Sequence, residues 1–112
     1  MTPQLRLKLP YFQAIASGAK TVEGRLKKPE LAALQPGDLI EFISEDDRTM
    51  RAEVVYNKEY RSFREMLLQE GIARCLPGLS NLEEGIQIYH SFPGYKAKEK
   101  ELGVLGIGIR VI

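Results

Sequence analysis

The 112-residue sequence has no tryptophan, one histidine and one cysteine. A lone Cys75 cannot form an internal disulfide, and without a cluster of cysteines and histidines the sequence predicts no zinc or other metal site. No apolar run approaches the roughly 20 residues that a membrane-spanning helix needs. The first residues lack a basic segment followed by an apolar one, so no signal peptide is predicted. These absences favour a cytoplasmic protein that has no membrane partner, metal ion or cofactor.

What is present is typical of a globular domain. Hydrophobic residues make up 44% of the chain and charged residues 28%, which excludes a disordered tail, a collagen and a coiled coil. The length suits one domain with its own core, so we expect residues 1–112 to form a single domain, with a monomer as the default. Residues 1–35 carry six lysines and arginines against two glutamates. This excess favours a surface that faces a polyanion, although an uneven solvated surface explains it equally well.

Local patterns predict the order of strands and helices. Alternating hydrophobic residues predict strands over residues 5–9, 20–25, 39–43, 50–60 and 103–112. Capping residues, prolines and glycines predict short helices over residues 11–17, 29–34, 62–71 and 82–91. Strands and helices do not alternate strictly, so we expect an α+β fold. Its small, mostly antiparallel sheet of five or six strands would curl into a barrel, with the short helices at the periphery.

The last predicted strand carries two glycines on one face. Gly106 and Gly108 leave bare backbone there, which admits either a ligand or a closely packed neighbour. Tyr11 and Phe12 are the neighbours that we expect. We favour close packing over a ligand.

The densest group of charged residues is the run Gly18-Ala19-Lys20-Thr21-Val22-Glu23-Gly24-Arg25. Glu23 and Arg25 lie two apart on a predicted strand and therefore point to the same side, and Lys20 stands near the start of that strand. Together they offer a cation, an acceptor and a bidentate donor, which suit a phosphate, a carboxylate or the edge of a nucleobase. A structural cluster of salt bridges explains the same residues.

A second candidate surface is the segment Tyr89-His90-Ser91-Phe92-Pro93-Gly94-Tyr95-Lys96. Tyr89 and Tyr95 are suited to stacking on a base, and the nearby lysine to contacting its phosphate. The alternative is that Tyr89 and Phe92 are core residues and His90 lies at the surface. Tyr95 is expected to be exposed, because the preceding Pro-Gly pair lifts the chain off the core.

The spacing Gly18-x-Lys20-x-x-Glu23-x-Arg25, after an N-terminal strand and a short helix, resembles the signature of ASCH domains. The resemblance extends to the turn Pro36-Gly37-Asp38 and to the end of the chain, where such domains place a charged turn before a last apolar strand. It implies a PUA-like β-barrel with a positively lined cleft and RNA or modified nucleosides as ligands. By position, Lys20, Glu23 and Arg25 would line that cleft.

Our first hypothesis is therefore binding of RNA, or of a modified or unmodified nucleobase or nucleoside. Lys20, Glu23 and Arg25 would contact the ligand, and Arg6, Tyr89 and Tyr95 would extend the contact surface. Glu23 would accept from an exocyclic amine, and a tyrosine would stack on the base.

Two other functions remain open. One is a hydrolase, either an amidohydrolase acting on N4-acetylcytidine or a ribonuclease, in which Lys20 and Glu23 are catalytic. Family members similar to N4-acetylcytidine amidohydrolase use the motif lysine with a threonine and a glutamate, and Glu23 stands here where that threonine would be. The other is a non-catalytic protein-interaction module that contacts its partner through the acidic turn Glu45-Asp46-Asp47.

Overall fold

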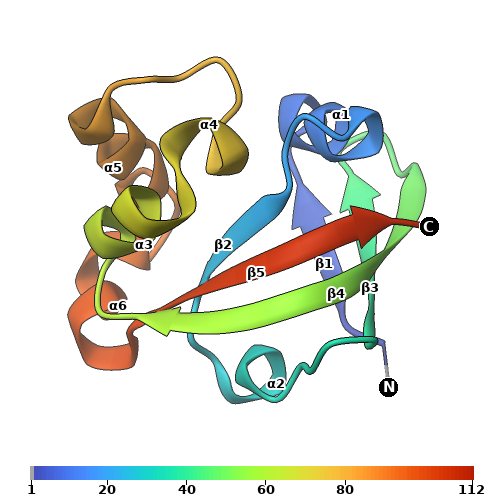
Figure 1. The fold of residues 1–112 in the computed structure, drawn as a ribbon, viewed down its shortest axis with the longest axis horizontal. Coiled ribbons are helices and arrows are strands. Elements are labelled where there is room, and N and C mark those ends of the chain that lie inside the picture. The colour runs from blue at the N-terminus through green and yellow to red at the C-terminus, as the bar shows by residue number, and fades with distance from the viewer. Residues whose placement is uncertain (1) are drawn as a thin grey trace.

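The computed structural model describes residues 2–112, which form five strands curled into a half-barrel and six short helices around it (Figure 1). The strands are β1 (Gln4–Leu7), β2 (Val22–Leu26), β3 (Leu39–Ser44), β4 (Thr49–Tyr60) and β5 (Val104–Val111). The helices are α1 (Leu9–Ser17), α2 (Pro29–Ala32), α3 (Phe63–Glu70), α4 (Ile72–Cys75), α5 (Leu82–His90) and α6 (Tyr95–Leu102). The four helices α3 to α6 gather on one side, whereas α1 and α2 lie at opposite ends of the half-barrel.

The strand order in the sheet is β1-β3-β4-β5-β2. The pair β1–β3 is parallel and the other three pairs are antiparallel. The predicted α+β fold, with a mostly antiparallel curled sheet and peripheral helices, is confirmed. The first and last strands in this order, β1 and β2, face each other across the opening of the half-barrel. Nη2 of Arg25 on β2 donates to the carbonyl oxygen of Arg6 on β1 at 3.0 Å, which links the two edges.

Buried apolar side chains form two cores on the two faces of the sheet. The inner core lies inside the curl under α1 and includes Phe12, Phe42 and Ile107. The outer core lies between the sheet and the helices α3 to α6 and includes Phe63 and Tyr89. Because β2 and β5 are covered on both faces, a residue on either face of these strands can be buried.

A bulge in β4 assigns its two halves to different cores. Strict alternation would place Tyr56 on the same face as Ala52 and Val54, which are both in the inner core. The register against β5 shifts between Val54 and Tyr56, so one extra residue is inserted, and Val55 is 46% exposed. Tyr56 therefore faces the outer core, where it packs with Tyr60.

The two tyrosines of β4 cover the bare backbone of β5. A Cβ atom on Gly108 would overlap the ring of Tyr56, and one on Gly106 would lie 3.0 Å from the ring of Tyr60. The close packing that we favoured is present, but the expected neighbours Tyr11 and Phe12 are wrong. The reason is the bulge, which brings Tyr56 and Tyr60 onto the glycine face.

Helix ends follow the capping signals, and helices without such signals escaped prediction. The Ser62 hydroxyl accepts from the Glu65 amide at 3.1 Å at the start of α3, and Asn81 caps α5 in the same way. Residues 95–102, expected as a charged turn, form α6 instead. No residue of α6 is fully buried, so it carries no apolar stripe that a sequence pattern could show. Its alanine, lysines and glutamates favour a helix, and Tyr95 and Glu99 hold it against Phe63.

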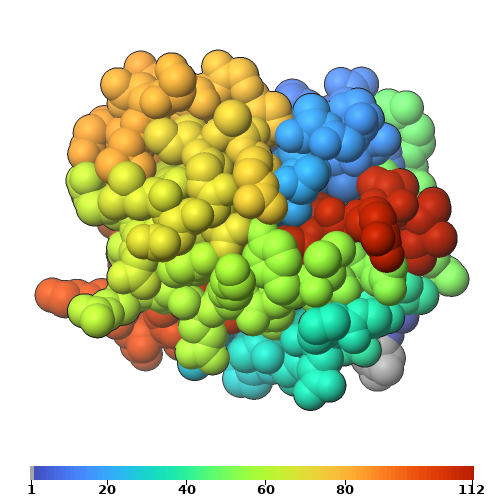
Figure 2. All heavy atoms as spheres, in the orientation of Figure 1, coloured from blue at the N-terminus to red at the C-terminus, as the bar shows by residue number. Residues whose placement is uncertain are grey.

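The helical side contacts the half-barrel directly at the start of β2. In Figure 2 the atoms of α4 (yellow) lie against those of α1 and the residues after it (blue). The Thr21 amide donates to the carbonyl oxygen of Arg74 at 3.0 Å. This contact fixes the short segment between α1 and β2, which contains Lys20.

We expect Gly108→Ala to lower the free energy of unfolding by about 1–3 kcal/mol, because the new methyl group displaces the Tyr56 ring. Urea denaturation measures this loss. The cost should shrink in a Tyr56→Ala background, where the ring is absent. Equal costs in both backgrounds would contradict the assigned contact.

Candidate functional site

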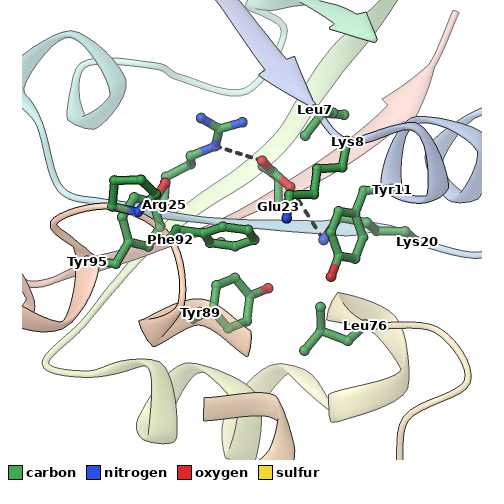
Figure 3. Close-up of a pocket in the computed structure, with 12 residues that line it drawn as sticks. Leu7, Lys8, Tyr11, Lys20, Glu23, Arg25, Leu76, Tyr89, Phe92 and Tyr95 are labelled. Atoms are coloured by element: carbon green, nitrogen blue, oxygen red, sulfur yellow. Dashed lines mark hydrogen bonds and ion pairs between the residues drawn. The ribbon is translucent and has the colours of Figure 1, made fainter. Parts of the chain in front are cut away.

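A hollow of about 230 Å³, called the first hollow below, lies between β1, β2, α1 and the segment from α5 to α6 (Figure 3). Four aromatic residues, Tyr11, Tyr89, Phe92 and Tyr95, line it. The three charged residues of the motif line it as well, namely Lys20, Glu23 and Arg25. The structure therefore brings the two segments singled out from the sequence, residues 18–25 and 89–96, to one site.

Lys20 is held in place by the backbone. Helix α1 ends at Gly18, whose φ of 85° turns the chain toward β2. The Lys20 Nζ donates to the carbonyl oxygens of Val22 at 2.7 Å and Cys75 at 2.5 Å, and lies 3.4 Å from Oε1 of Glu23. An ammonium group has three protons, of which the two carbonyl oxygens take two, and Glu23 adds an ion pair. Lys20, which is only 3% exposed, thus fixes the site's geometry through partners within the protein.

Glu23 lies between the two cations, as Figure 3 shows. Its Oε2 accepts from Nε of Arg25 at 2.7 Å. Burial by itself raises the pKa of the Glu23 carboxyl, but the charge and hydrogen bonds of Arg25 and then Lys20 outweigh burial, and the pKa is lowered. The carboxylate is therefore ionised at neutral pH. It has about four acceptor positions, of which the two cations occupy two, so it can accept further hydrogen bonds from a ligand.

Arg25 keeps donors free. Its Nε and one Nη2 proton are used by Glu23 and by the carbonyl oxygen of Arg6. Three of the five guanidinium protons remain, and the Tyr95 hydroxyl lies close enough to accept one of them. The side chain is 19% exposed, against 3% for Lys20. Of the two motif cations, Arg25 is thus the one placed to bind an anion.

Tyr89 carries a buried hydroxyl without a hydrogen-bond partner among residues 2–112. Burial raises its pKa well above the ordinary value, so the group stays protonated and able to donate. The ring stacks on Phe63 with centroids 4.4 Å apart and planes 5° apart. A Cβ on the neighbouring Gly24 would lie 2.9 Å from the Tyr89 hydroxyl oxygen, so only glycine leaves room for this side chain.

Tyr89 and Tyr95 were expected to offer ring faces for stacking on a base, but both rings are packed against other rings of the protein. Tyr89 is 3% exposed, and what it presents to the hollow is its hydroxyl and not a free ring face. Tyr95 is partly buried, because its ring also stacks on Phe63, at 5.6 Å. The Pro-Gly pair does follow the end of α5, but it does not lift the chain off the protein. Phe92 before it and Tyr95 after it both pack against the outer core.

Two other predicted residues lie outside the first hollow. The Arg6 side chain is 71% exposed and lies 3.7 Å from Asp47, so its part here is the backbone carbonyl oxygen that holds Arg25. His90, expected at the surface, is partly buried, and its Nε2 lies 2.9 Å from Oε1 of Glu99 on α6.

Sequence reasoning assigned no site role to Tyr11 and named Phe92 only within the second candidate segment. Lys8 lies at the rim of the hollow, with its Nζ 5.8 Å from the centre of the Phe92 ring. Tyr11 lies under the Lys20 ammonium, 5.9 Å from the ring centre. The available signal was Pro10, which favours the first turn of a helix and so places Tyr11 in α1.

The sequence and fold of this chain match those of known proteins. The family model of the ASCH domain matches residues 5–110, nearly the whole chain. The chain belongs to the ASCH domain family. The resemblance inferred from the motif and its flanks is thus confirmed.

Solved structures agree with this ASCH assignment. The crystal structure of the hypothetical protein PH0355 is 36% identical and superposes with a TM-score of 0.88, covering 100% of both chains. The solution structure of protein PF0455 from Pyrococcus furiosus is 35% identical, with a TM-score of 0.78 over 100% of this chain and 98% of the other. Protein EF3133 from Enterococcus faecalis V583 shares the fold at 10% identity, with a TM-score of 0.70 over 100% and 81% of the chains. No curated protein matches the sequence.

Two further observations concern the described part of this ASCH domain. Among residues 2–112, no three histidine, cysteine, aspartate or glutamate side chains gather as metal ligands would. Within the same residues, every helix is too short or too polar to cross a membrane.

We expect Glu23→Gln to lower the free energy of unfolding at neutral pH by about 3–5 kcal/mol, because it leaves the buried Lys20 without its anion. The pH dependence should change as well. The folded-state pKa lies below the ordinary value of 4.5, so the carboxylate stabilises the fold fully above that value and loses its effect as the pH falls through the folded pKa. Urea denaturation between about pH 5 and about pH 3 should show a steeper loss in the native protein than in the variant.

The matched control is Glu59→Gln, which removes an exposed carboxylate paired with Lys27. Its stability should follow the native pH curve closely. If Glu23→Gln does not fold, NMR titration of the native Glu23 carboxyl replaces it, with a midpoint below 4.5 expected. A midpoint above that value, or parallel curves for both variants, contradicts the lowered pKa.

Proposed function

We propose that this protein binds RNA, or a nucleoside, by taking one base into the first hollow. The volume of about 230 Å³ is below the range of about 300–1,000 Å³ that is usual for drug-sized ligands, and it suits one base with part of its sugar. The aromatic walls offer apolar contact to a planar ring. Family membership supports a ligand of this class.

The unpartnered Tyr89 hydroxyl is the observation that carries this proposal. A buried hydroxyl without a partner costs about 1–3 kcal/mol, and Tyr89 is a residue of the hollow's lining. A ligand atom or a water molecule that bonds to it recovers that cost. The ionised Glu23 lines the same hollow and offers free acceptor positions. A flat ring that carries an amine together with a ring nitrogen or carbonyl oxygen satisfies both groups.

The rim of the hollow suits the phosphates of a nucleotide. Arg25 has unused guanidinium protons, and Lys8 is exposed beside Phe92. Lysine and arginine at the mouth of an aromatic hollow form the usual arrangement for binding a base together with its backbone phosphate.

The other two hypotheses stay predictions with weaker support. A hydrolase that uses Lys20 as its base or nucleophile requires this ammonium to leave two carbonyl oxygens and a carboxylate. An interaction module built on the acidic turn requires carboxylates that are free, but Glu45 accepts from the Leu9 amide at 2.6 Å and Asp46 pairs with Arg48 at 2.8 Å. Incubation with N4-acetylcytidine or labelled RNA, with Lys20→Ala as control, tests for turnover.

We expect Tyr89→Phe to weaken cytidine binding about two- to tenfold, because it removes one hydrogen bond to the ligand. The melting temperature of the ligand-free variant should stay equal or rise, since the hydroxyl has no partner to lose. Calorimetric titration and thermal melting measure the two effects. Tyr60→Phe is the control, because that hydroxyl bonds to Glu70 and its loss should lower stability without changing affinity. A destabilised Tyr89→Phe with native affinity would refute the assigned role.

We expect cytidine to bind about tenfold or more tightly than uridine, because a carboxylate accepts from the amine of cytosine and repels the carbonyl oxygen of uracil. An amide can turn either its oxygen or its amino group to the ligand, so Glu23→Gln should remove most of this preference. The same titrations measure it. Equal affinities for cytidine and uridine in the native protein would place the base elsewhere than against Glu23.

A further inference from the structure

A second, larger hollow of about 480 Å³ lies beside the first one. Gln4 and Leu5 of β1 line it on one side, and Leu26 and Lys28 line it on the other. Leu31, next to the end of α2, is part of its floor. The second hollow thus lies between the same two edge strands as the first, but nearer to α2. Helix α2 itself lies at the end of the half-barrel opposite to α1 (Figure 1).

Arg25 and Tyr95 line both hollows. The guanidinium of Arg25 spans the opening between the edge strands, with Nε bonded to Glu23 and Nη2 bonded to the carbonyl oxygen of Arg6. It therefore forms the partition between the hollows and keeps unused protons. A single anionic group placed over Arg25 would lie between the two hollows.

The lining of the second hollow is mixed in character. Leucines supply apolar surface, and Lys28 supplies an exposed positive charge. Two carboxylates, those of Glu30 and Asp38, also line it, and Oδ2 of Asp38 already accepts from the Gln35 amide at 2.8 Å within its own turn. Apolar surface next to a lysine suits a sugar and base together with a phosphate.

We propose that the two hollows are neighbouring subsites of one groove, and that the natural ligand is single-stranded RNA of at least two nucleotides. One base enters the first hollow, the linking phosphodiester lies on Arg25, and the next nucleotide occupies the second hollow beside Lys28. This inference rests on the proposed function, because it takes the first hollow as a base site. The inference names a ligand class, oligonucleotides, because a free nucleoside would occupy only one of the two hollows.

The test compares cytidine, its 5′- and 3′-monophosphates and the dinucleotide CpC at one fixed salt concentration, by calorimetric titration. We expect CpC to bind about tenfold or more tightly than either monophosphate, because a second nucleotide gains its own contacts. Lys28→Ala should weaken CpC binding several-fold and leave cytidine binding unchanged. Lys100→Ala, which removes an exposed lysine of α6 outside both hollows, should change neither.

A steric variant tests the second hollow without removing a charge. Ala33 is exposed and lines only the second hollow, so Ala33→Phe should fill it, cancel the advantage of CpC and leave cytidine binding unchanged. Ala97→Phe, on the exposed side of α6, is the matched control.

The outcomes separate the two proposals. If cytidine binds, Tyr89→Phe weakens it and CpC gains nothing over the monophosphates, the second subsite is refuted and the base site stands. If CpC keeps its advantage in both Lys28→Ala and Ala33→Phe, the second nucleotide lies elsewhere and the subsite is also refuted. If neither cytidine nor CpC binds, both proposals fail.

Discussion

The structure around the site depends on one buried carboxylate. Removing Glu23 from water is costly, and only two cations within hydrogen-bonding distance make its ionised form favourable there. These cations are themselves tied to separate parts of the chain. Lys20 bonds to the carbonyl oxygen of Cys75 in α4, and Arg25 bonds to that of Arg6 in β1. The carboxylate thus holds together a helix and two strands that are far apart in the sequence, and it places a negative charge at the edge of a hollow.

The second constraint is the open sheet. A strand order that begins with β1 and ends with β2 leaves two edges with unpaired backbone groups, which proteins normally cover or close. Here the two edges approach each other but do not pair, and the Arg25 guanidinium bridges them in place of a strand ladder. The gap that remains on either side of this side chain is what forms the two hollows. The groove that we propose as the RNA site is therefore a direct consequence of two strand edges that are linked by one side chain.

Much of the fold was predictable because its signals are local. Alternation predicted all five strands, and caps such as Ser62 and Asn81 marked the ends of helices. The missed features depend on non-local contacts. The bulge after Val54 moves Tyr56 to the outer core, and no property of β4 alone requires an extra residue there. Helix α6 has no buried residue, so hydrophobic periodicity has nothing to detect in it.

At the site, too, features set by neighbouring residues were predictable, and features set by residues distant in the sequence were not. The spacing within residues 18–25 was sufficient to predict that Glu23 and Arg25 point the same way, because a strand has a period of two. The lowered pKa of Glu23 depends on its burial and on Arg25 and Lys20, and Lys20 in turn bonds to Cys75, which is 55 residues away in the sequence. Tyr89 was noticed for its ring, whereas its hydroxyl is what the structure leaves unsatisfied.

The unpartnered Tyr89 hydroxyl is informative because the ring that carries it is tightly packed. Phe63 stacks on the Tyr89 ring, and Gly24 leaves the space that the ring and its hydroxyl occupy. A phenylalanine would fill the same space without a buried polar atom, so stability alone does not account for tyrosine here. Local violations of the rule that buried polar groups are paired concentrate at functional sites. Tyr89 lines the same hollow as the ionised Glu23, and the ligand that we propose would bond to both groups.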